Sequence, residues 1–222
     1  MRTSSRNLAV LLFDEVELWD VAALMQVASM AGRHWNWRPF RLLPASERAG
    51  LITTRSQIRL EASTTLAECP EPEVLFIPGG YGARRAAQNP GIIAWCARLW
   101  PRLDTVLASG AGAAVLAAAG VLEGAEVAAT SENIPWLSES FPGTRWVDAA
   151  AVVHSLSGKL LTVGNGNQSI ELGVALVERC LGARLARTVR SSLGLVAPTT
   201  RIEVGSVPLP VPGAGTEPPR QG

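Results

Sequence analysis

Histidine and cysteine are scarce in this chain of 222 residues, which contains two histidines and three cysteines. Cys69, Cys96 and Cys180 form no CxxC pair, and their odd number argues against a disulfide framework. We expect the three cysteines to be small buried hydrophobic residues. No group of histidines, cysteines and carboxylates has the spacing of metal ligands. The sequence therefore predicts no metal site and no resident cofactor.

Neither sign of charge is in excess, and long apolar runs are absent. Lys and Arg total 20 against 19 Asp and Glu, and no basic block is dense enough to follow a phosphate backbone, so we expect no nucleic-acid partner. Gly, Pro and charged residues interrupt each apolar run before the ~18 residues of a membrane span, so we expect no membrane contact. Residues 1–7 lack the features of a signal peptide, which favours a cytoplasmic location.

Strand-like and helix-like segments alternate along the chain. Residues 8–13 form a continuous apolar run, typical of a strand buried on both faces of a parallel sheet, and apolar residues then recur at helical spacing from 16 to 32. The other expected elements are strands at 37–43 and 74–77, a hairpin at 52–60, a helix at 89–100, a strand at 126–130, a helix or loop at 134–141, an antiparallel hairpin of 146–154 with 159–163, and helices at 168–181 and 185–193.

This alternation predicts an α/β domain over residues 1–195, with a doubly wound, mostly parallel sheet flanked by helices and a small antiparallel hairpin. Residues 196–222 are rich in Pro and Gly and contain too little apolar surface to order themselves. We expect them to form a flexible tail.

Residues 104–120 have the pattern of a nucleophile elbow: a buried strand, a sharp turn and a helix of small residues. The tip of this elbow is Gly110, which has no side chain. Glycine enters positive φ with little penalty, whereas another residue there stores about 1–3 kcal/mol of backbone strain. Ser109 precedes the tip, but strand alternation directs its side chain away from the direction taken by residue 110. We therefore expect no nucleophile at the elbow.

Several motifs resemble the ThiJ/PfpI superfamily, which is built on the class I glutamine-amidotransferase-like, flavodoxin-like fold, and the isonitrile-hydratase branch is the most similar. Their order and spacing cover residues 7–195. The motifs are Phe13-Asp14-x-Val16-Glu17-x-x-Asp20, Val74-Leu75-Phe76-Ile77-Pro78-Gly79-Gly80-Tyr81-Gly82, the elbow with its continuation Leu116-Ala117-Ala118-Ala119-Gly120-Val121-Leu122-Glu123-Gly124, and Phe141-Pro142.

The resemblance implies a site that this chain has in part. The family places a cysteine at the elbow tip, an acidic residue on the first helix beside it, and in many members a histidine after the next strand. By position these fall on Gly110, on Asp20 and near Thr130 or Ser131, so the cysteine and the histidine are missing. His34 and His154 lie elsewhere in the pattern, and we expect them to be structural or exposed. The resemblance also implies a homodimer.

A pocket for a small molecule is nevertheless expected at the elbow. Backbone amides of Gly79, Gly80 and Ala111, beside Gly110, are suited to hold an anion or oxyanion. Asp20, expected at the rim against apolar residues, either has a pKa raised by desolvation and acts as an acid or base, or hydrogen-bonds nearby backbone. In the glycine-rich turn at 164–169, Asn165, Asn167 or Gln168 either contact the same pocket or cap a helix.

Three hypotheses for the function follow. The first is a small-molecule enzyme that works without the cysteine, with Asp20 directing hydratase, lyase or isomerase chemistry. The second is a pseudoenzyme that binds a small molecule or a partner. The third is a dinucleotide-binding domain, because 110–115 follows a strand, opens a helix and precedes Glu132, although Val115 replaces the third glycine. Some relatives attach a helix-turn-helix DNA reader after this domain, where this chain has its Pro-rich segment, so a regulatory role is not expected.

Overall fold

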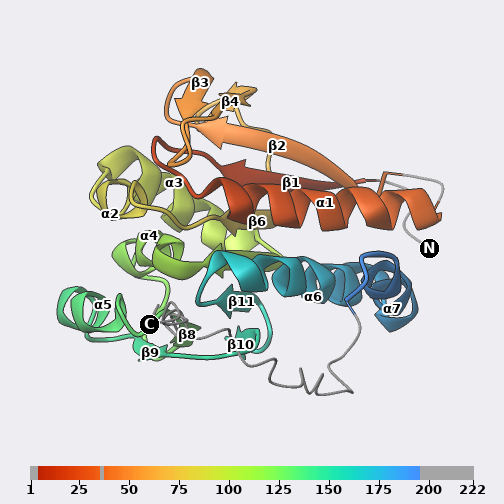
Figure 1. Ribbon diagram of the computed structural model, residues 1–222. Coiled ribbons are helices and arrows are strands. Elements are labelled where there is room, and N and C mark those ends of the chain that lie inside the picture. Colours follow the sequence, from red (N-terminus) through yellow and green to blue (C-terminus); the bar gives the residue numbers. More distant parts are fainter. Residues whose placement is uncertain (1–4, 36–37, 196–222) are drawn as a thin grey trace, which may run out of the picture.

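Seven strands form the central sheet of the computed structural model, which describes residues 5–35 and 38–195, in the order β10-β11-β7-β6-β1-β2-β5 (Figure 1). The strands are β1 (Arg6–Leu11), β2 (Phe40–Ser46), β3 (Gly50–Thr53), β4 (Arg59–Ala62), β5 (Thr64–Thr65), β6 (Val74–Ile77), β7 (Thr105–Ser109), β8 (Glu126–Ala128), β9 (Arg145–Val147), β10 (Val153–Ser155) and β11 (Leu160–Val163). The helices are α1 (Leu18–Trp35), α2 (Ala83–Ala86), α3 (Pro90–Leu99), α4 (Ala113–Ala118), α5 (Ile134–Ser140), α6 (Ser169–Leu181) and α7 (Ala183–Ser192), with short 3-10 turns η1 (Trp100–Arg102), η2 (Gly110–Gly112) and η3 (Gly166–Gln168).

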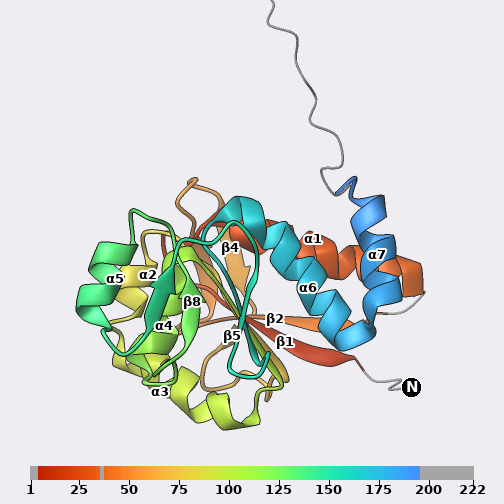
Figure 2. The same cartoon turned by 90° about the horizontal axis from the view of Figure 1, so that it is seen from below.

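The central sheet is parallel except at one edge. β2, β1, β6, β7 and β11 pair in parallel, while β10 is antiparallel to β11. Figure 2 shows α1, α6 and α7 on one side of the sheet and α2 to α5 on the other. Every residue of β6, β7 and β11 is buried, as expected for strands covered by helices on both faces. The predicted doubly wound sheet with a small antiparallel hairpin is confirmed.

One predicted strand is in fact two. Residues 146–154 were expected to form a single strand of the hairpin with 159–163. Instead β9 pairs in parallel with β8 in a separate two-stranded sheet, and only β10 pairs with β11. The apolar alternation of the segment fits two short strands as well as one long strand, because alternation records burial on one face and not the identity of the partner.

The other predicted elements are present with shifted ends. The hairpin expected at 52–60 is β3 with β4, and the helix expected at 89–100 begins at Pro90, after an Asn89 side chain that accepts hydrogen bonds from the Gly91 and Ile92 amides. β2 begins at Phe40 and continues through Pro44, later than the strand predicted at 37–43. α2 was not predicted. The predicted tail at 196–222 lies outside the described residues.

The helices on one face pack closely against one another. A Cβ atom on Gly173 of α6 would lie 2.8 Å from Cβ of Val27 in α1, so only glycine permits this close approach. Glu171 of α6 forms an ion pair with Arg190 of α7. α1, α6 and α7 therefore form one packed layer, and the first turns of α1 and α6 lie at the edge of the sheet where β6, β7 and β11 end (Figure 1).

Candidate functional site

The elbow has the predicted strand–turn–helix geometry, and its tip has no side chain, as predicted. β7 ends at Ser109, η2 follows, and α4 continues from Ala113. Gly110 has φ of 51°, in the left-handed region that favours glycine. A Cβ atom on Gly112 would lie 2.4 Å from the carbonyl oxygen of Pro78, so the turn packs directly against the backbone after β6. The tip thus faces the site without a side chain that can attack a substrate.

Asp20 is buried below the pocket, not at its rim, with 2 % of its surface exposed. Its Oδ2 atom accepts a hydrogen bond of 2.7 Å from the amide of Gly79. Its Oδ1 atom accepts hydrogen bonds from the hydroxyls of Ser109, at 3.0 Å, and Ser169, at 2.7 Å. One carboxyl group therefore joins α1, the loop after β6, the end of β7 and the start of α6.

Burial raises the pKa of Asp20 above its ordinary value of 3.8. The hydrogen bonds from Ser169, Gly79 and Ser109 act in the opposite direction because they stabilise the charged form, and the nearby Glu17 carboxylate raises the pKa further. The direction of the shift is the one that the sequence predicted. The hydrogen bond from the Gly79 amide confirms that Asp20 binds nearby backbone, and its role as an acid or base stays a prediction.

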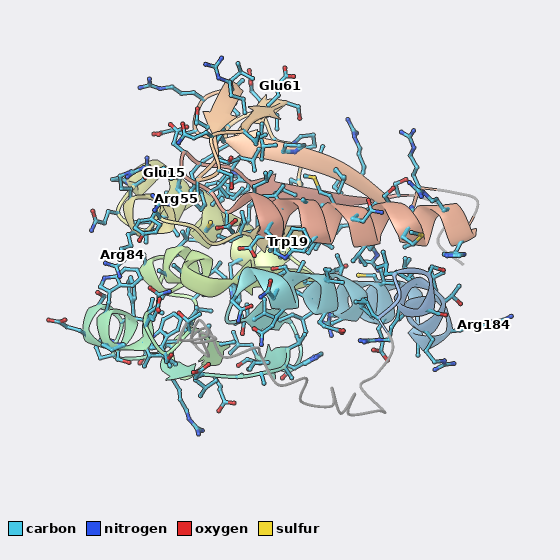
Figure 3. The ribbon with its side chains drawn as sticks, in the orientation of Figure 1. Glu15, Trp19, Arg55, Glu61, Arg84 and Arg184 are labelled. Atoms are coloured by element: carbon cyan, nitrogen blue, oxygen red, sulfur yellow. The ribbon has the colours of Figure 1, made fainter. Side chains whose placement is uncertain are left out.

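Two glycines enclose the Asp20 carboxyl group. A Cβ atom on Gly79 would lie 3.0 Å from Oδ2, and one on Gly166 would lie 3.1 Å from Oδ1 and 2.9 Å from Cδ1 of Trp19. Side chains at either position would press on the carboxyl group or on the indole ring. Figure 3 shows Trp19 at the first turn of α1, on the side that faces α6.

A cavity of about 530 Å³ opens above this group, within the range of small-molecule sites. Its lining includes every residue that the sequence assigned to the site: Asp20, Gly79, Gly80, Gly110 and Ala111. Its other lining residues are Glu17, Tyr81, Arg84, Ser109, Glu132, Asn133, Gly164, Asn165 and Gly166.

The backbone amides predicted for the pocket are not equivalent. The amide of Gly79 donates to Asp20 and is therefore engaged within the protein, contrary to the predicted role as a ligand donor. Gly80 has φ of 114°, and a Cβ atom there would lie 2.4 Å from the carbonyl oxygen of Glu15. Ala111 lies in the first turn of η2, where amides have no partner within the helix.

Charged and aromatic side chains surround the opening. Glu17 and Glu132 contribute carboxylates, and Arg84 contributes a guanidinium that stacks on the Trp136 ring, 4.3 Å from the ring centroid. Arg55, from the hairpin of β3 and β4, stacks 3.9 Å above the ring of Tyr81. Figure 3 shows Arg84 of α2 on the side of the molecule where α2 and α5 lie, so the pocket has one cation in its lining.

Hydrogen bonds within the polar turn before α6 stabilise it. The Asn165 side chain accepts a hydrogen bond from the Asn167 amide, and Gln168 accepts from the Gly164 amide while donating to the Ala149 carbonyl. The helix-cap reading of this turn is confirmed, and Asn165 in addition lines the pocket. Ser169, the next residue, was not singled out from the sequence.

The histidines, the cysteines and Thr130 do not line the pocket. His34 contacts Ser192 at 2.8 Å, and His154 is exposed on β10. Burial raises the pKa of the Cys96 thiol to about 12, and burial likewise raises the pKa of Cys69 and Cys180, so the three thiols are poor nucleophiles. Thr130, where the family histidine was expected, accepts a hydrogen bond from the Asn133 side chain.

Within residues 5–35 and 38–195, no group of three or more histidine, cysteine or acidic residues is arranged to hold a metal ion. No helix within these ranges combines the length and apolarity needed to cross a membrane.

The chain is 25 % identical over 151 residues to the HTH-type transcriptional regulator CdhR of Pseudomonas aeruginosa, a match that covers 67 % of this chain and 44 % of the regulator. The chain thus spans less than half the length of that relative.

Solved structures share the fold. A ThiJ/PfpI family protein from Pseudomonas syringae superposes with a TM-score of 0.73 at 18 % identity, covering 91 % of this chain and 80 % of that chain. An AraC family transcriptional regulator from Pseudomonas putida superposes with a TM-score of 0.71 at 22 % identity, covering 85 % of this chain and 99 % of that chain. The family model described as DJ-1/PfpI matches residues 6–179, so this chain belongs to the DJ-1/PfpI family.

Proposed function

We propose that this chain binds a small organic molecule in the pocket above Asp20 and forms no covalent bond to it. The observation that carries the proposal is Gly110: the elbow, the cavity and the supporting acid are all present, and the tip has no nucleophile. A protein of this design holds a ligand by contacts alone. This is the binding form of the pseudoenzyme hypothesis.

The partners of Asp20 support binding over chemistry at this residue. Three donors engage its two oxygens, and the carboxyl group is nearly inaccessible to solvent. A general acid or base must reach the proton that it transfers, directly or through one water molecule. Asp20 instead joins four segments of the pocket wall, which is a positioning role.

A second candidate function is acid–base chemistry of the hydratase, lyase or isomerase type with Asp20 as the proton carrier. The raised pKa of Asp20 favours it, because a carboxyl group transfers protons best when its pKa approaches the working pH. A shift of the loop that carries Gly79 is needed to expose the carboxyl group to a substrate. For this reason we place this function second.

The dinucleotide hypothesis loses its main support. Gly112, the second glycine of the 110–115 pattern, packs against the Pro78 carbonyl oxygen, which lies 2.4 Å from where a Cβ atom would stand. Val115, in place of the third glycine, is fully buried in α4. The glycines of 110–112 therefore have a structural explanation that requires no dinucleotide.

The relatives favour a role in sensing. CdhR is named as an HTH-type transcriptional regulator, and the pocket above Asp20 offers a place where a protein of that class could take a ligand. We propose that the present domain detects a small effector, and that it does so as a homodimer, as the family resemblance implies. Contact with DNA forms no part of the proposal.

The test is a binding screen with a matched pair of variants. Thermal shifts are recorded for the full chain with panels of small amines, carboxylates and amides. The Glu132→Trp variant places an indole at the pocket opening, whereas Glu139→Trp places one on the exposed face of α5 outside the pocket. A ligand that stabilises the unmodified protein and the Glu139→Trp protein, but not the Glu132→Trp protein, supports the pocket. Stabilisation of all three proteins, or of none, contradicts it.

Turnover is measured separately. The protein is incubated with a panel of small isonitriles, formamide products are sought by mass spectrometry, and Asp20→Asn serves as the control. We expect no product from either protein. Product that disappears in the Asp20→Asn protein would establish the enzymatic alternative.

A further inference from the structure

A second hollow lies at the opposite end of α1 from the pocket above Asp20. It has a volume of about 970 Å³ and lies between the last turns of α1 and the start of β2. Asp20 and Arg33 are separated by 13 positions of α1, which is about 20 Å at 1.5 Å per residue. In Figure 1 this is the end of α1 next to the label of the N-terminus. The two cavities are therefore separate sites.

Three arginines surround this hollow. Arg33 comes from the last turn of α1, Arg38 precedes β2, and Arg41 lies within β2. All three side chains are exposed, and none of them forms an ion pair with a carboxylate of the described residues. No described lining residue of the hollow is acidic. Arg85 and Arg190, by contrast, each face a glutamate.

The charge of the hollow favours an anion with more than one negative charge. Three guanidinium groups bring three positive charges to one concavity. The C-terminal end of α1 opposes them with roughly half a negative charge, which the guanidiniums exceed several-fold. Arginine also binds phosphate through two parallel N–H donors, which lysine does not match.

The rest of the wall combines apolar residues with two serines. Ala28, Pro39, Phe40 and Leu42 contribute apolar surface, and Ser5 and Ser29 contribute hydroxyl groups. An inorganic anion leaves this surface unfilled. A ligand that carries an apolar or aromatic body beside its charged group covers both parts of the wall, and the volume lies at the upper end of the range for such ligands.

We propose that this hollow, which we call the arginine hollow, binds an organic di- or triphosphate. The phosphates contact Arg33, Arg38 and Arg41, and the organic body lies against the apolar wall. The site is independent of the pocket above Asp20, and the inference does not depend on the function proposed for that pocket.

Calorimetric titration of the full chain with ATP tests the proposal, with inorganic tripolyphosphate as the second probe. ATP is expected to bind at low salt, and tripolyphosphate to bind more weakly because it lacks the organic body. The double variant Arg33→Gln/Arg41→Gln removes two guanidiniums, so its affinity for ATP is expected to fall at least about tenfold. These exposed side chains leave the core unchanged, and circular dichroism checks the fold.

Two controls distinguish this site from charge in general and from the other pocket. Arg184→Gln/Arg187→Gln removes two exposed arginines of α7 outside the hollow, and ATP affinity is expected to stay within about twofold. Glu132→Trp, which fills the opening above Asp20, is expected to leave ATP binding unchanged. Absence of ATP binding, equal binding of tripolyphosphate, equal losses in the two double variants, or loss in Glu132→Trp would each overturn the proposal.

Discussion

The Oδ2 atom of Asp20 lies 2.7 Å from the amide nitrogen of Gly79, and this hydrogen bond joins the first turn of α1 to the loop after β6. The loop also carries Gly80 and Tyr81, which line the pocket. The position of the pocket wall therefore depends on the hydrogen bond from the Gly79 amide to the Asp20 carboxyl group. Disturbing Asp20 is expected to change binding through the shape of the wall.

Restoring a thiol at the elbow tip tests the geometry of the site. In Gly110→Cys, the new Cβ atom lies 3.1 Å from the carbonyl oxygen of Gly164, and a φ of 51° strains a residue other than glycine. We expect a loss of about 1–3 kcal/mol in the free energy of unfolding. We also expect rapid alkylation by iodoacetamide, measured by mass spectrometry, at a rate well above those of the three native cysteines.

Gly120→Cys is the matched control for that variant. Gly120 also has positive φ, and nothing lies within 4 Å of its added Cβ atom. Alkylation of the thiol at 110 should abolish binding of any ligand found for the pocket, whereas alkylation at 120 should not. Equal effects at both positions would mean that residue 110 does not face the ligand.

Ser169 is predicted to stabilise the fold through Asp20. Ser169→Ala removes a donor at 2.7 Å from a buried carboxyl group, so the free energy of unfolding is expected to fall by about 1–3 kcal/mol. The pKa of Asp20 is expected to rise further, because the hydrogen bond from Ser169 lowers it. Carboxyl NMR shifts measure the second effect. Ser191→Ala, an exposed change on α7, should alter neither quantity.

The raised pKa of Asp20 predicts a specific pH dependence of stability. Because the folded protein holds this proton more tightly than the unfolded chain, the contribution of Asp20 to the free energy of unfolding falls as pH rises from about 4 through the raised pKa. The slope for one group is at most about 1.4 kcal/mol per pH unit. In the Asp20→Asn protein, the amide oxygen still accepts hydrogen bonds, but the side chain does not ionise.

Denaturant unfolding of both proteins between about pH 4 and pH 8 measures this difference. Asp20→Asn should gain stability relative to the unmodified protein as pH rises, and the difference should then level off above the pKa. A difference that is constant with pH, or that shrinks as pH rises, contradicts a raised pKa.

An alanine at position 112 is predicted to destabilise the fold through a steric clash and not through backbone strain. Its φ of −59° suits any residue, but an added Cβ atom would lie 2.4 Å from the Pro78 carbonyl oxygen. Gly112→Ala is expected to lower the free energy of unfolding by about 3 kcal/mol. Gly124→Ala, at positive φ in open space, is expected to cost about 1 kcal/mol. A smaller loss at 112 than at 124 would show that the turn relaxes easily.

The sequence predicted those parts of the fold that depend on local pattern. Apolar runs identified β1, β6 and β7, and the small residues after Ser109 identified the elbow, because such patterns follow from burial and from turn sterics. The pattern over 146–154 failed because it carries no information on which strand pairs with which.

Motifs in the sequence predicted individual residues of the site, but not the contacts between residues that are distant in the sequence. Asp20 and Gly110 were found from aligned motifs, and the desolvation of Asp20 followed from its neighbours. Ser169 was missed because its contact with Asp20 spans 149 residues, and nothing in the spacing of a polar turn indicates which carboxylate it meets. The engagement of the Gly79 amide was missed for the same reason.

The network around Asp20 also has a consequence for the order of folding. Its members come from α1, the loop after β6, the end of β7 and the start of α6, so it closes only when these distant segments have docked on the sheet. Contacts of such long range form late, because the chain must first lose the entropy of the loops between them. Ligand binding should therefore appear in the final phase of refolding, together with native packing of α6. Partly folded chains should not bind the ligand.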